Sequence, residues 1–449
     1  MITIGELSRT VKKAMDSSDF KTARLQHKHE ELLVYYYESL CDLKVLRERI
    51  SAPLVKRSEE QTFTEVLQSE LGCEEVHDVS EVVEKLLRGC IVIYVKDHVF
   101  VLQALKVLTD QVREATVEAS IEGPHYCLTE NLHMNLNLIR QRYPSKDLTA
   151  KEKVLGRISN TKLILLYHEG LVQAEVLAHI EQQLSRIDVD LIQSHGQLEA
   201  LMTKKKYRLF PLMLNTERPD RIALNLAQGK VVILLDGIPS ALIAPAVFYD
   251  FISAVDDTTQ SFFVSHSIVL LRYMALLITI TLPALYIAIV SYNPEIFRVQ
   301  LAVSIAGSRA SVPYPSFVEV FIMMFIIETL IEASIRLPKY IGQAATTVGG
   351  LILGQAAQQA GLVSSIMIIV TSMVAIVNFV IPINAMSYAM RVVKYPFILL
   401  SMFFGITGII VALFCFSMYL ANMESFGQPY FKLFVGEKSA TGYKHKETS

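Results

Sequence analysis

Three charged side chains at a regular spacing lie in a largely apolar stretch in the last third of the chain. In "FVEVFIMMFIIETLIEASIR" (317–336), Glu328, Glu332 and Arg336 follow one another at intervals of four residues. That spacing places all three on one face of a helix. A charge in hydrocarbon costs at least about 2.5 kcal/mol, so the face must meet water or protein, where it could hold or pass ions. A structural salt ladder near lipid headgroups explains the same spacing equally well.

The stretch that follows, "IGQAATTVGGLILGQAAQQAG" (341–361), carries small and polar residues along one side. Two of its glycines have the small-xxx-small spacing that lets helices approach closely. The side is either a packing surface or the lining of a polar path, and both uses require that it faces away from lipid. We expect the two polar faces to meet across an antiparallel helix pair. The predicted pore or bundle-interior residues are Glu328, Glu332, Arg336, Thr347, Gly350, Gly354 and Gln358.

No residue pattern in the chain predicts catalysis, a cofactor or a metal site. Asp236-Gly237 lies between two apolar runs, which is the usual chemistry of a tight hairpin turn. The histidines at 168, 179 and 195 lack the close spacing of metal ligands. Five cysteines without a CxxC pair suit reduced thiols. The net charge of −2 gives no reason to expect nucleic acid as a partner.

Charge is dense up to about residue 260, whereas long apolar runs dominate from 262 to 423. "SIVLLRYMALLITITLPALYIAIV" (267–290) is long enough to cross a hydrocarbon core of about 30 Å. The charged stretch 295–315 is better placed at the interface or in a re-entrant segment. An odd number of spans would put the lysine-rich C-terminus outside, so one segment could be re-entrant. The predicted membrane segments are 264–290, 317–337, 341–361, 364–382 and 396–422.

The first half of the chain contains an internal repeat. "RGCIVIYVKDHVFVLQA" (88–104) and "QGKVVILLDGIPSALIA" (228–244) each predict a β-hairpin after a helix. Strand patterns at 31–40 and 162–171, each followed by a helix pattern, precede them. Two similar α/β lobes are therefore predicted. The N-terminus has no apolar core of signal-peptide length, so we expect both lobes to be cytoplasmic.

A polar stretch, "TENLHMNLNLIRQRYPSKDL" (129–148), lies between the two lobes. Thr129 or Asn131 can cap a short helix whose apolar residues begin at Leu132. The predicted fold is thus an α/β cytoplasmic N-terminal domain of two similar lobes followed by an α-helical multi-pass membrane domain. Its predicted parts are a first lobe (1–120), a linker block (121–150), a second lobe (151–260), the membrane domain (261–425) and a C-terminal tail (426–449).

Several long blocks of this sequence occur in an order that resembles a known family. They are "GPHYCLTENLHMNLNLIRQR" (123–142), "LNTERPDRIALNLAQGKVVILLDGIPSALIAP" (214–245), "SIAGSRASVPYPSFVEV" (304–320), "EASIRLPKYIGQAATTVGGLILGQAAQQAGLVS" (332–364) and "FGQPY" (426–430). They are similar to the signature blocks of the A subunit of spore germinant receptors, the GerA family. The resemblance implies a protein of the spore inner membrane that works with B and C subunits. In that family the B subunit is thought to bind the nutrient, and A subunits are thought to form a homo-oligomeric ring that conducts ions.

The resemblance also suggests which residues join and assemble the lobes. The first block is the one that connects the two lobes in the family, and its charged and amide residues match the polar core of that connection. In the second block, "TERPD" precedes the second hairpin, where a rigid proline and opposite charges could fix how the lobes dock. The residues predicted for lobe linkage and assembly are Glu130, Asn131, Arg140, Arg142, Glu217, Arg218, Pro219 and Asp220.

Three other functions were compared with the sequence: an accessory homologue, a transporter and an enzyme. An accessory A-subunit homologue in another spore membrane channel complex would share the same blocks. A secondary transporter would need paired broken helices in matching halves of the membrane region, and no such symmetry is visible. A membrane-anchored enzyme would need a catalytic constellation, which the sequence lacks.

Overall fold

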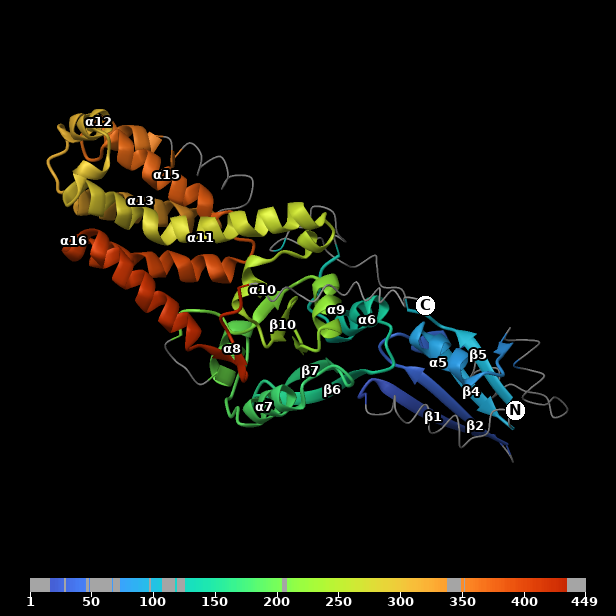
Figure 1. Ribbon diagram of the computed structural model, residues 1–449. Helices are drawn as coiled ribbons and strands as arrows, with labels where there is room; N and C mark the ends of the chain where they lie inside the picture. Colours follow the sequence, from blue (N-terminus) through green and yellow to red (C-terminus); the bar gives the residue numbers. More distant parts are fainter. Residues whose placement is uncertain are drawn as a thin grey trace, which may run out of the picture.

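The computed structural model describes residues 17–27, 30–45, 48, 67, 73–96, 98–106, 118, 126–203, 208–336, 349–350 and 352–433. The first β-sheet lobe forms one end of the molecule, the second lobe follows it along the long axis, and a helical region forms the opposite end (Figure 1).

The first lobe is an antiparallel sheet with the strand order β1-β2-β4-β5-β3. Every residue of its central strand β4 is buried, because apolar clusters form on both faces of the sheet. Gly89 has a φ of 81° at the end of the helix before β4, a conformation that suits glycine. The elements are β1 (Phe20–His27), β2 (Glu30–Tyr37), α2 (Leu43–Val45), β3 (Glu74–Glu75), α5 (Val79–Leu87), β4 (Cys90–Val95) and β5 (His98–Gln103). The helix predicted after the first strand pattern (44–50) lies mostly outside the described residues.

The second lobe repeats this plan with the strand order β6-β7-β9-β10-β8. Both predicted hairpins are confirmed, as the pairs β4–β5 and β9–β10. Helices α7 and α8 cover one face of the second sheet, and α6 and α9 cover the other. The elements are α6 (Leu132–Arg142), β6 (Leu148–Leu155), β7 (Thr161–His168), α7 (Ala174–Ser185), α8 (His195–Thr203), β8 (Leu214–Thr216), α9 (Pro219–Ala227), β9 (Val231–Leu235), β10 (Ala241–Ala244) and α10 (Phe248–Ile252).

The helical region continues the core of the second lobe, because one apolar cluster runs from α6 and α9 into α11 and α16. Among the described residues, α11 and α16 are the two helices long and apolar enough to cross a membrane. The elements are η3 (Val255–Thr258), α11 (Phe262–Ser291), η4 (Pro294–Ile296), α12 (Val299–Arg309), α13 (Ser316–Arg336), α15 (Ser365–Asn378) and α16 (Asn384–Ala421). The predicted segment 341–361 lies partly outside the described residues.

Helix α16 consists of two arms, which meet within the segment predicted over 396–422. Gly405 has a φ of 58° and a ψ of −135°, which ends the first arm (384–404) and starts the second (406–421). A straight helix of 38 residues would be about 57 Å long, roughly twice the thickness of a hydrocarbon core. The bend lies beside Tyr292, at the far end of α11, so the second arm returns toward the second lobe (Figure 1). The apolar sequence around Gly405 contains no strong turn signal that would reveal this bend.

The chain after α16 folds back onto the second lobe. A short hairpin of β11 (Glu424–Ser425) and β12 (Gln428–Pro429) leads to Tyr430, which is fully buried. The Tyr430 ring packs against Phe210, Phe248 and Phe251 of the second lobe. Residues 426–433, predicted as the start of the C-terminal tail, include this contact. Both ends of the helical region thus lie at the second lobe.

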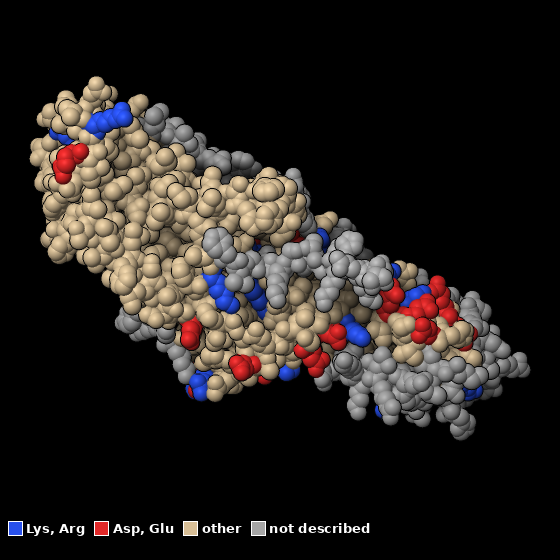
Figure 2. All heavy atoms as spheres, in the orientation of Figure 1, with Lys and Arg blue, Asp and Glu red and all other residues tan. Residues whose placement is uncertain are grey.

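Charged side chains are distributed unevenly over the surface. Figure 2 shows Lys, Arg, Asp and Glu mainly over the two sheet lobes, with a small group at the far tip and few between. On the helical region many large apolar side chains are exposed, among them Phe403, Phe404 and Phe414 of α16, each more than 60% exposed. On the face shown, an apolar region thus lies between two polar ends.

Candidate functional site

A network of three charges joins α13 to the first arm of α16. Glu328 Oε2 accepts a hydrogen bond from Arg391 Nε at 2.7 Å, and Glu328 Oε1 accepts one from Lys394 Nζ at 2.6 Å. Lys394 is only 1% exposed. One carboxylate therefore faces two cations among the described contacts. Glu328 is 12 residues from the start of α13, which places the network about 18 Å from the far tip.

The structure gives Glu328 a partner other than the predicted one. We expected its face to meet the polar face of 341–361, but its cationic partners come from α16. Gly350 instead approaches Leu330, because a Cβ on Gly350 would lie 3.3 Å from Leu330 Cδ2. Leu330 is two residues from Glu328 and so points to the opposite side of α13. Where the structure describes them, the two faces do not meet.

The other predicted pore residues are scattered. Glu332 is exposed on α13. Gly354 has open space around it, since no heavy atom lies within 4 Å of the position of an added Cβ. Gln358 Nε2 donates to Ser365 Oγ at 2.9 Å, close to the far tip. The side chain of Arg336 and all of Thr347 lie outside what the structure describes. The role of this set in a conduction path stays a prediction.

A second buried carboxylate, which sequence reasoning did not single out, lies near the far tip. Glu319 is completely buried. Its Oε2 accepts a hydrogen bond from Tyr286 Oη at 3.0 Å and lies 3.5 Å from Arg309 Nε. Its Oε1 accepts one from Ser364 N at 2.6 Å. The cluster ties α11, α12 and α13 to the start of α15.

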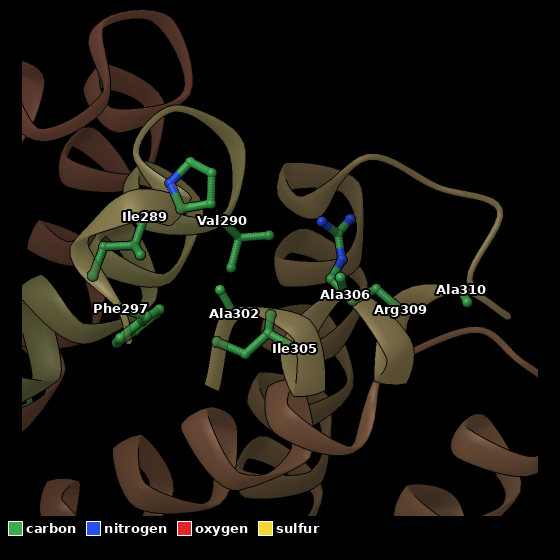
Figure 3. A pocket seen from close by; sticks show the side chains of 9 residues that line it. Ile289, Val290, Phe297, Ala302, Ile305, Ala306, Arg309 and Ala310 are labelled. Carbon is green, nitrogen blue, oxygen red and sulfur yellow. The ribbon is translucent and has the colours of Figure 1, made fainter. Parts of the chain in front are cut away.

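A cavity of about 330 Å³ opens beside this cluster, between the end of α11, η4 and α12. Figure 3 shows Val290 facing Ala302 and Ile305 across it, with the Arg309 guanidinium on one side. Its walls are otherwise mainly apolar, so the cavity suits the apolar part of a lipid or another helix better than a polar substrate.

Arg218 fastens the turn that leads from the second lobe into α11. Its side chain is buried and lies 2.7 Å from Asp220 Oδ2 and 3.3 Å from Asp256 Oδ1. Pro219 begins α9, where its missing N–H costs nothing. Asp256 belongs to η3, and the next residue, Asp257, accepts a hydrogen bond at 3.0 Å from Arg272 of α11. Arg218 of the second lobe and Arg272 of α11 thus each bind an aspartate of this turn.

The neighbouring Arg221 was not predicted as a site residue, although it is almost fully buried. It pairs with Glu118 and donates to the carbonyl oxygen of Asp250 at 2.7 Å. Glu217 accepts a hydrogen bond from the backbone N–H of Glu118 at 3.1 Å. These contacts place Glu118 against the second lobe.

The helix predicted between the lobes is present, and Asn131 is its cap. Asn131 Oδ1 accepts hydrogen bonds from His133 N at 3.0 Å and Met134 N at 3.1 Å. Glu130 is exposed, and its carbonyl oxygen accepts a hydrogen bond from Gly237 N at 2.9 Å. Arg142, at the end of the helix, is also exposed. The start of the helix is thereby joined to the hairpin of the second lobe.

Arg140 connects this helix to the first lobe. Its Nε and Nη2 each donate to Asp19 at 2.6 Å, and its guanidinium lies 4.3 Å from the centre of the Tyr37 ring. Burial alone raises the pKa of Asp19, but the Arg140 charge and the donors Ser17 and Ser39 outweigh it, so this pKa lies below its ordinary value of 3.8. Both charges are almost fully buried, so neither has water as an alternative partner.

The profile of the family described as "Bacillus/Clostridium GerA spore germination protein" matches residues 6–444 of this chain. Spore germination protein KA of Bacillus subtilis is 33% identical over 435 residues, which cover 94% of this chain and 80% of that protein. The chain belongs to the GerA family.

The chain is also similar to a membrane protein and to a solved domain structure. The membrane protein YfkQ of Bacillus subtilis is 30% identical over 404 residues, covering 88% of this chain and 79% of YfkQ. The crystal structure of the N-terminal domain of the A subunit of the Bacillus megaterium spore germinant receptor GerK3 covers 54% of this chain. The two share 24% sequence identity and superpose with a TM-score of 0.42, and the matched region covers 94% of that structure.

In this GerA-family chain, sequence reasoning missed the residues that complete each network. Arg391 and Lys394 are three residues apart on the first arm of α16, a spacing that indicates one helical face. That pair could have been found as the cationic complement of Glu328. Glu319 had no such signal, because its partners Tyr286, Arg309 and Ser364 come from three different segments and share no helical face. Within the described ranges, no group of three or more His, Cys, Asp or Glu side chains could hold a metal ion.

Proposed function

We propose that this chain is the A-type subunit of a spore germinant receptor. It is a multi-pass protein of the spore inner membrane, with its N-terminal lobes in the cytoplasm, and it is not an enzyme. It assembles as a homo-oligomer together with B and C subunits and helps to trigger germination by nutrient-gated ion release. The proposal is supported by membership of the GerA family and by buried charges in an apolar helical region.

The exposed surface of the helical region supports the membrane part of the proposal. Monomeric soluble proteins rarely expose apolar patches of more than a few hundred Å². Here the exposed apolar side chains continue along α11, α15 and α16. Helix α11 has 30 residues and is therefore about 45 Å long, enough to cross a bilayer with its headgroups.

The path of the chain supports an even number of membrane crossings. The start of α11 is tied to the second lobe through Arg272, and the end of α16 through Tyr430. Because the two arms of α16 count as separate crossings, no re-entrant segment is needed to keep the C-terminus on the same side as the lobes. The lysines of the C-terminal tail favour the cytoplasmic side as well.

The charge network of Glu328, Arg391 and Lys394 is the observation that best supports a role in ion movement. Among the described contacts, one carboxylate in this network faces two cations, and lipid would tolerate such charges poorly. In an oligomer the network could instead face neighbouring subunits or a hydrated path. A shift of α13 against α16 would separate the charges, so this contact is suited to distinguish a closed from an open state.

The proposal is tested by reconstituting the protein with its B and C subunits in vesicles and recording nutrient-stimulated release of monovalent ions. We expect Glu328→Gln to alter that release, while Glu295→Gln, an exposed carboxylate at the far tip, serves as a matched control. In spores, deletion should block ion release in response to some nutrient. Normal release in spores that also lack every paralogue would refute the proposal.

A further inference from the structure

The cavity beside the Glu319 cluster has a size that suits an alkyl chain. Its volume is about 330 Å³, and its walls come from the end of α11, from η4 with the residue after it, and from α12. One turn of a helix, about 5.4 Å long and about 10 Å wide, occupies roughly 420 Å³ and does not fit. Taking about 30 Å³ per heavy atom, the volume of one water molecule in the liquid, gives room for a chain of roughly ten heavy atoms.

The walls of this cavity are apolar except at one end of α12. Val290 of α11 faces Ala302 and Ile305 of α12 across the space, and Phe297 lies at one side (Figure 3). Among the nine described residues that line the cavity, Arg309 is the only one with a polar side chain. An occupant that is apolar along its length and polar at one end therefore matches these walls.

The guanidinium of Arg309 keeps N–H donors for such an occupant. Its Nη2 donates to Tyr314 O at 3.2 Å, and its Nε is buried and lies 3.5 Å from Glu319 Oε2 without forming a hydrogen bond. Among the described contacts, Nη1 has no acceptor. The side chain is nevertheless 20% exposed, and Figure 3 shows its two outer nitrogens on the side away from the α12 backbone. An anion can therefore reach the outer end of the guanidinium.

The nearby carboxylate does not occupy this outer end. Glu319 is completely buried and is absent from the described walls of the cavity. Its Oε1 accepts a hydrogen bond from Ser364 N, and its Oε2 accepts one from Tyr286 Oη. Both carboxylate oxygens thus have neutral donors of their own. On the cavity side an anion meets the arginine and not the carboxylate.

The cavity is continuous with an exposed apolar surface. Ile296, Val299 and Leu301 are 56%, 78% and 48% exposed, and they belong to η4 and α12, which also line the cavity. If the proposed membrane location holds, α11 crosses the bilayer from the second lobe, and its length of about 45 Å places its end at the opposite headgroup level. At that level a basic side chain beside an apolar space favours an anionic lipid headgroup.

We propose that this cavity binds an alkyl chain of an anionic phospholipid whose phosphate accepts hydrogen bonds from the Arg309 guanidinium. The inference rests on the membrane location in the proposed function. A free fatty acid offers the same chemistry, but the continuity of the cavity with an apolar surface favours a lipid of the bilayer. The bound lipid packs against both α11 and α12, the helices that the Glu319 cluster joins to α13.

The test uses the full-length protein in nanodiscs of equal parts phosphatidylglycerol and phosphatidylcholine with the same chains. Release into mild detergent and native mass spectrometry then count the lipids that stay bound. We expect phosphatidylglycerol to be retained in about fivefold excess, because one basic side chain near a bilayer surface contributes about that factor. Arg309→Met should make the retention of the two lipids about equal. Arg298→Met, at an exposed arginine outside the described walls, is the control and should keep the preference.

A second variant guards against a rearrangement of the Glu319 cluster in Arg309→Met. Ala306 lines the cavity and is exposed, so Ala306→Phe fills part of the space and leaves Arg309 in place. This variant should keep its thermal stability and retain several-fold less phosphatidylglycerol. Equal retention of both lipids by the unaltered protein, a preference that persists in Arg309→Met, or full retention in Ala306→Phe would each overturn the proposal.

Two further measurements separate the alternatives. Octanoate represents a free fatty acid, and octanoate binding without retained phosphatidylglycerol would overturn the assignment to a phospholipid. Co-elution of the chain with nanodiscs, before detergent is added, reports membrane insertion. A chain that does not insert refutes the membrane location and this inference with it, whereas an inserted chain without lipid preference refutes this inference alone.

Discussion

Replacing Arg140 by methionine tests how the first lobe is held to the helix between the lobes. The change keeps the apolar stem but leaves the Asp19 carboxylate, 7% exposed, with only hydroxyl donors. Removing one partner of a buried ion pair costs about 3–5 kcal/mol, because the other charge stays buried. Since about 1.4 kcal/mol corresponds to a factor of ten, amides of β1 and β2 should exchange hydrogen about 10²- to 10⁴-fold faster.

The assay is hydrogen exchange of the full-length protein in nanodiscs, with mass spectrometry resolving β1, β2 and α6. Asp19→Asn should have a similar effect, whereas Arg140→Met combined with Asp19→Leu should cost less than the sum of the single changes. Arg88→Met, at an exposed ion pair with Glu84, is the control and should change exchange little. Unchanged exchange in the single variants, or strict additivity in the double variant, would refute the reasoning.

This contact also has a defined pH dependence. The folded-state pKa of Asp19 lies below the ordinary value of 3.8. The ion pair therefore stabilises the fold fully above about pH 4, and its contribution is lost as the pH falls through the lowered pKa. Exchange of β1 in the Arg140→Met variant should lose that acid dependence.

Three further predictions concern the helical region and a buried histidine of the second lobe. Gly405→Ala should lower stability in detergent by at least about 1–2 kcal/mol, because a Cβ would lie 3.1 Å from Tyr292 Cγ at a φ of 58°, whereas Gly354→Ala, in open space, should be tolerated. Glu328→Gln should lower the thermal stability of the purified protein by leaving two cations without a carboxylate, and an unchanged melting temperature would contradict the network's energetic role. Burial lowers the pKa of His195 to about 4, so as the pH falls the unfolded chain binds a proton at this histidine before the folded chain does. The free energy of unfolding should therefore decrease by up to about 3 kcal/mol between pH 6.5 and 4. His195→Gln should remove this dependence on pH.

The elements that depend on local pattern could be predicted from the sequence. Asn131 caps its helix because the acceptor and the N–H groups that it satisfies are two and three residues apart. The hairpins at 88–104 and 228–244 follow from β-branched runs on either side of a polar turn. The length of α11 follows from a run of apolar residues that water would not tolerate. In each case the decisive interactions join neighbours in the chain or act between the chain and its solvent.

The pairing of buried charges was decided by the tertiary structure. Glu328 pairs with residues 63 and 66 positions further along the chain, and Arg140 pairs with one that lies 121 positions earlier. The spacing of Glu328, Glu332 and Arg336 could not supply these partners, because a periodic pattern defines only the direction of a face and not the element opposite it. The bend at Gly405 and the return of Tyr430 to the second lobe have the same origin. Each depends on close packing between segments that no local propensity brings together.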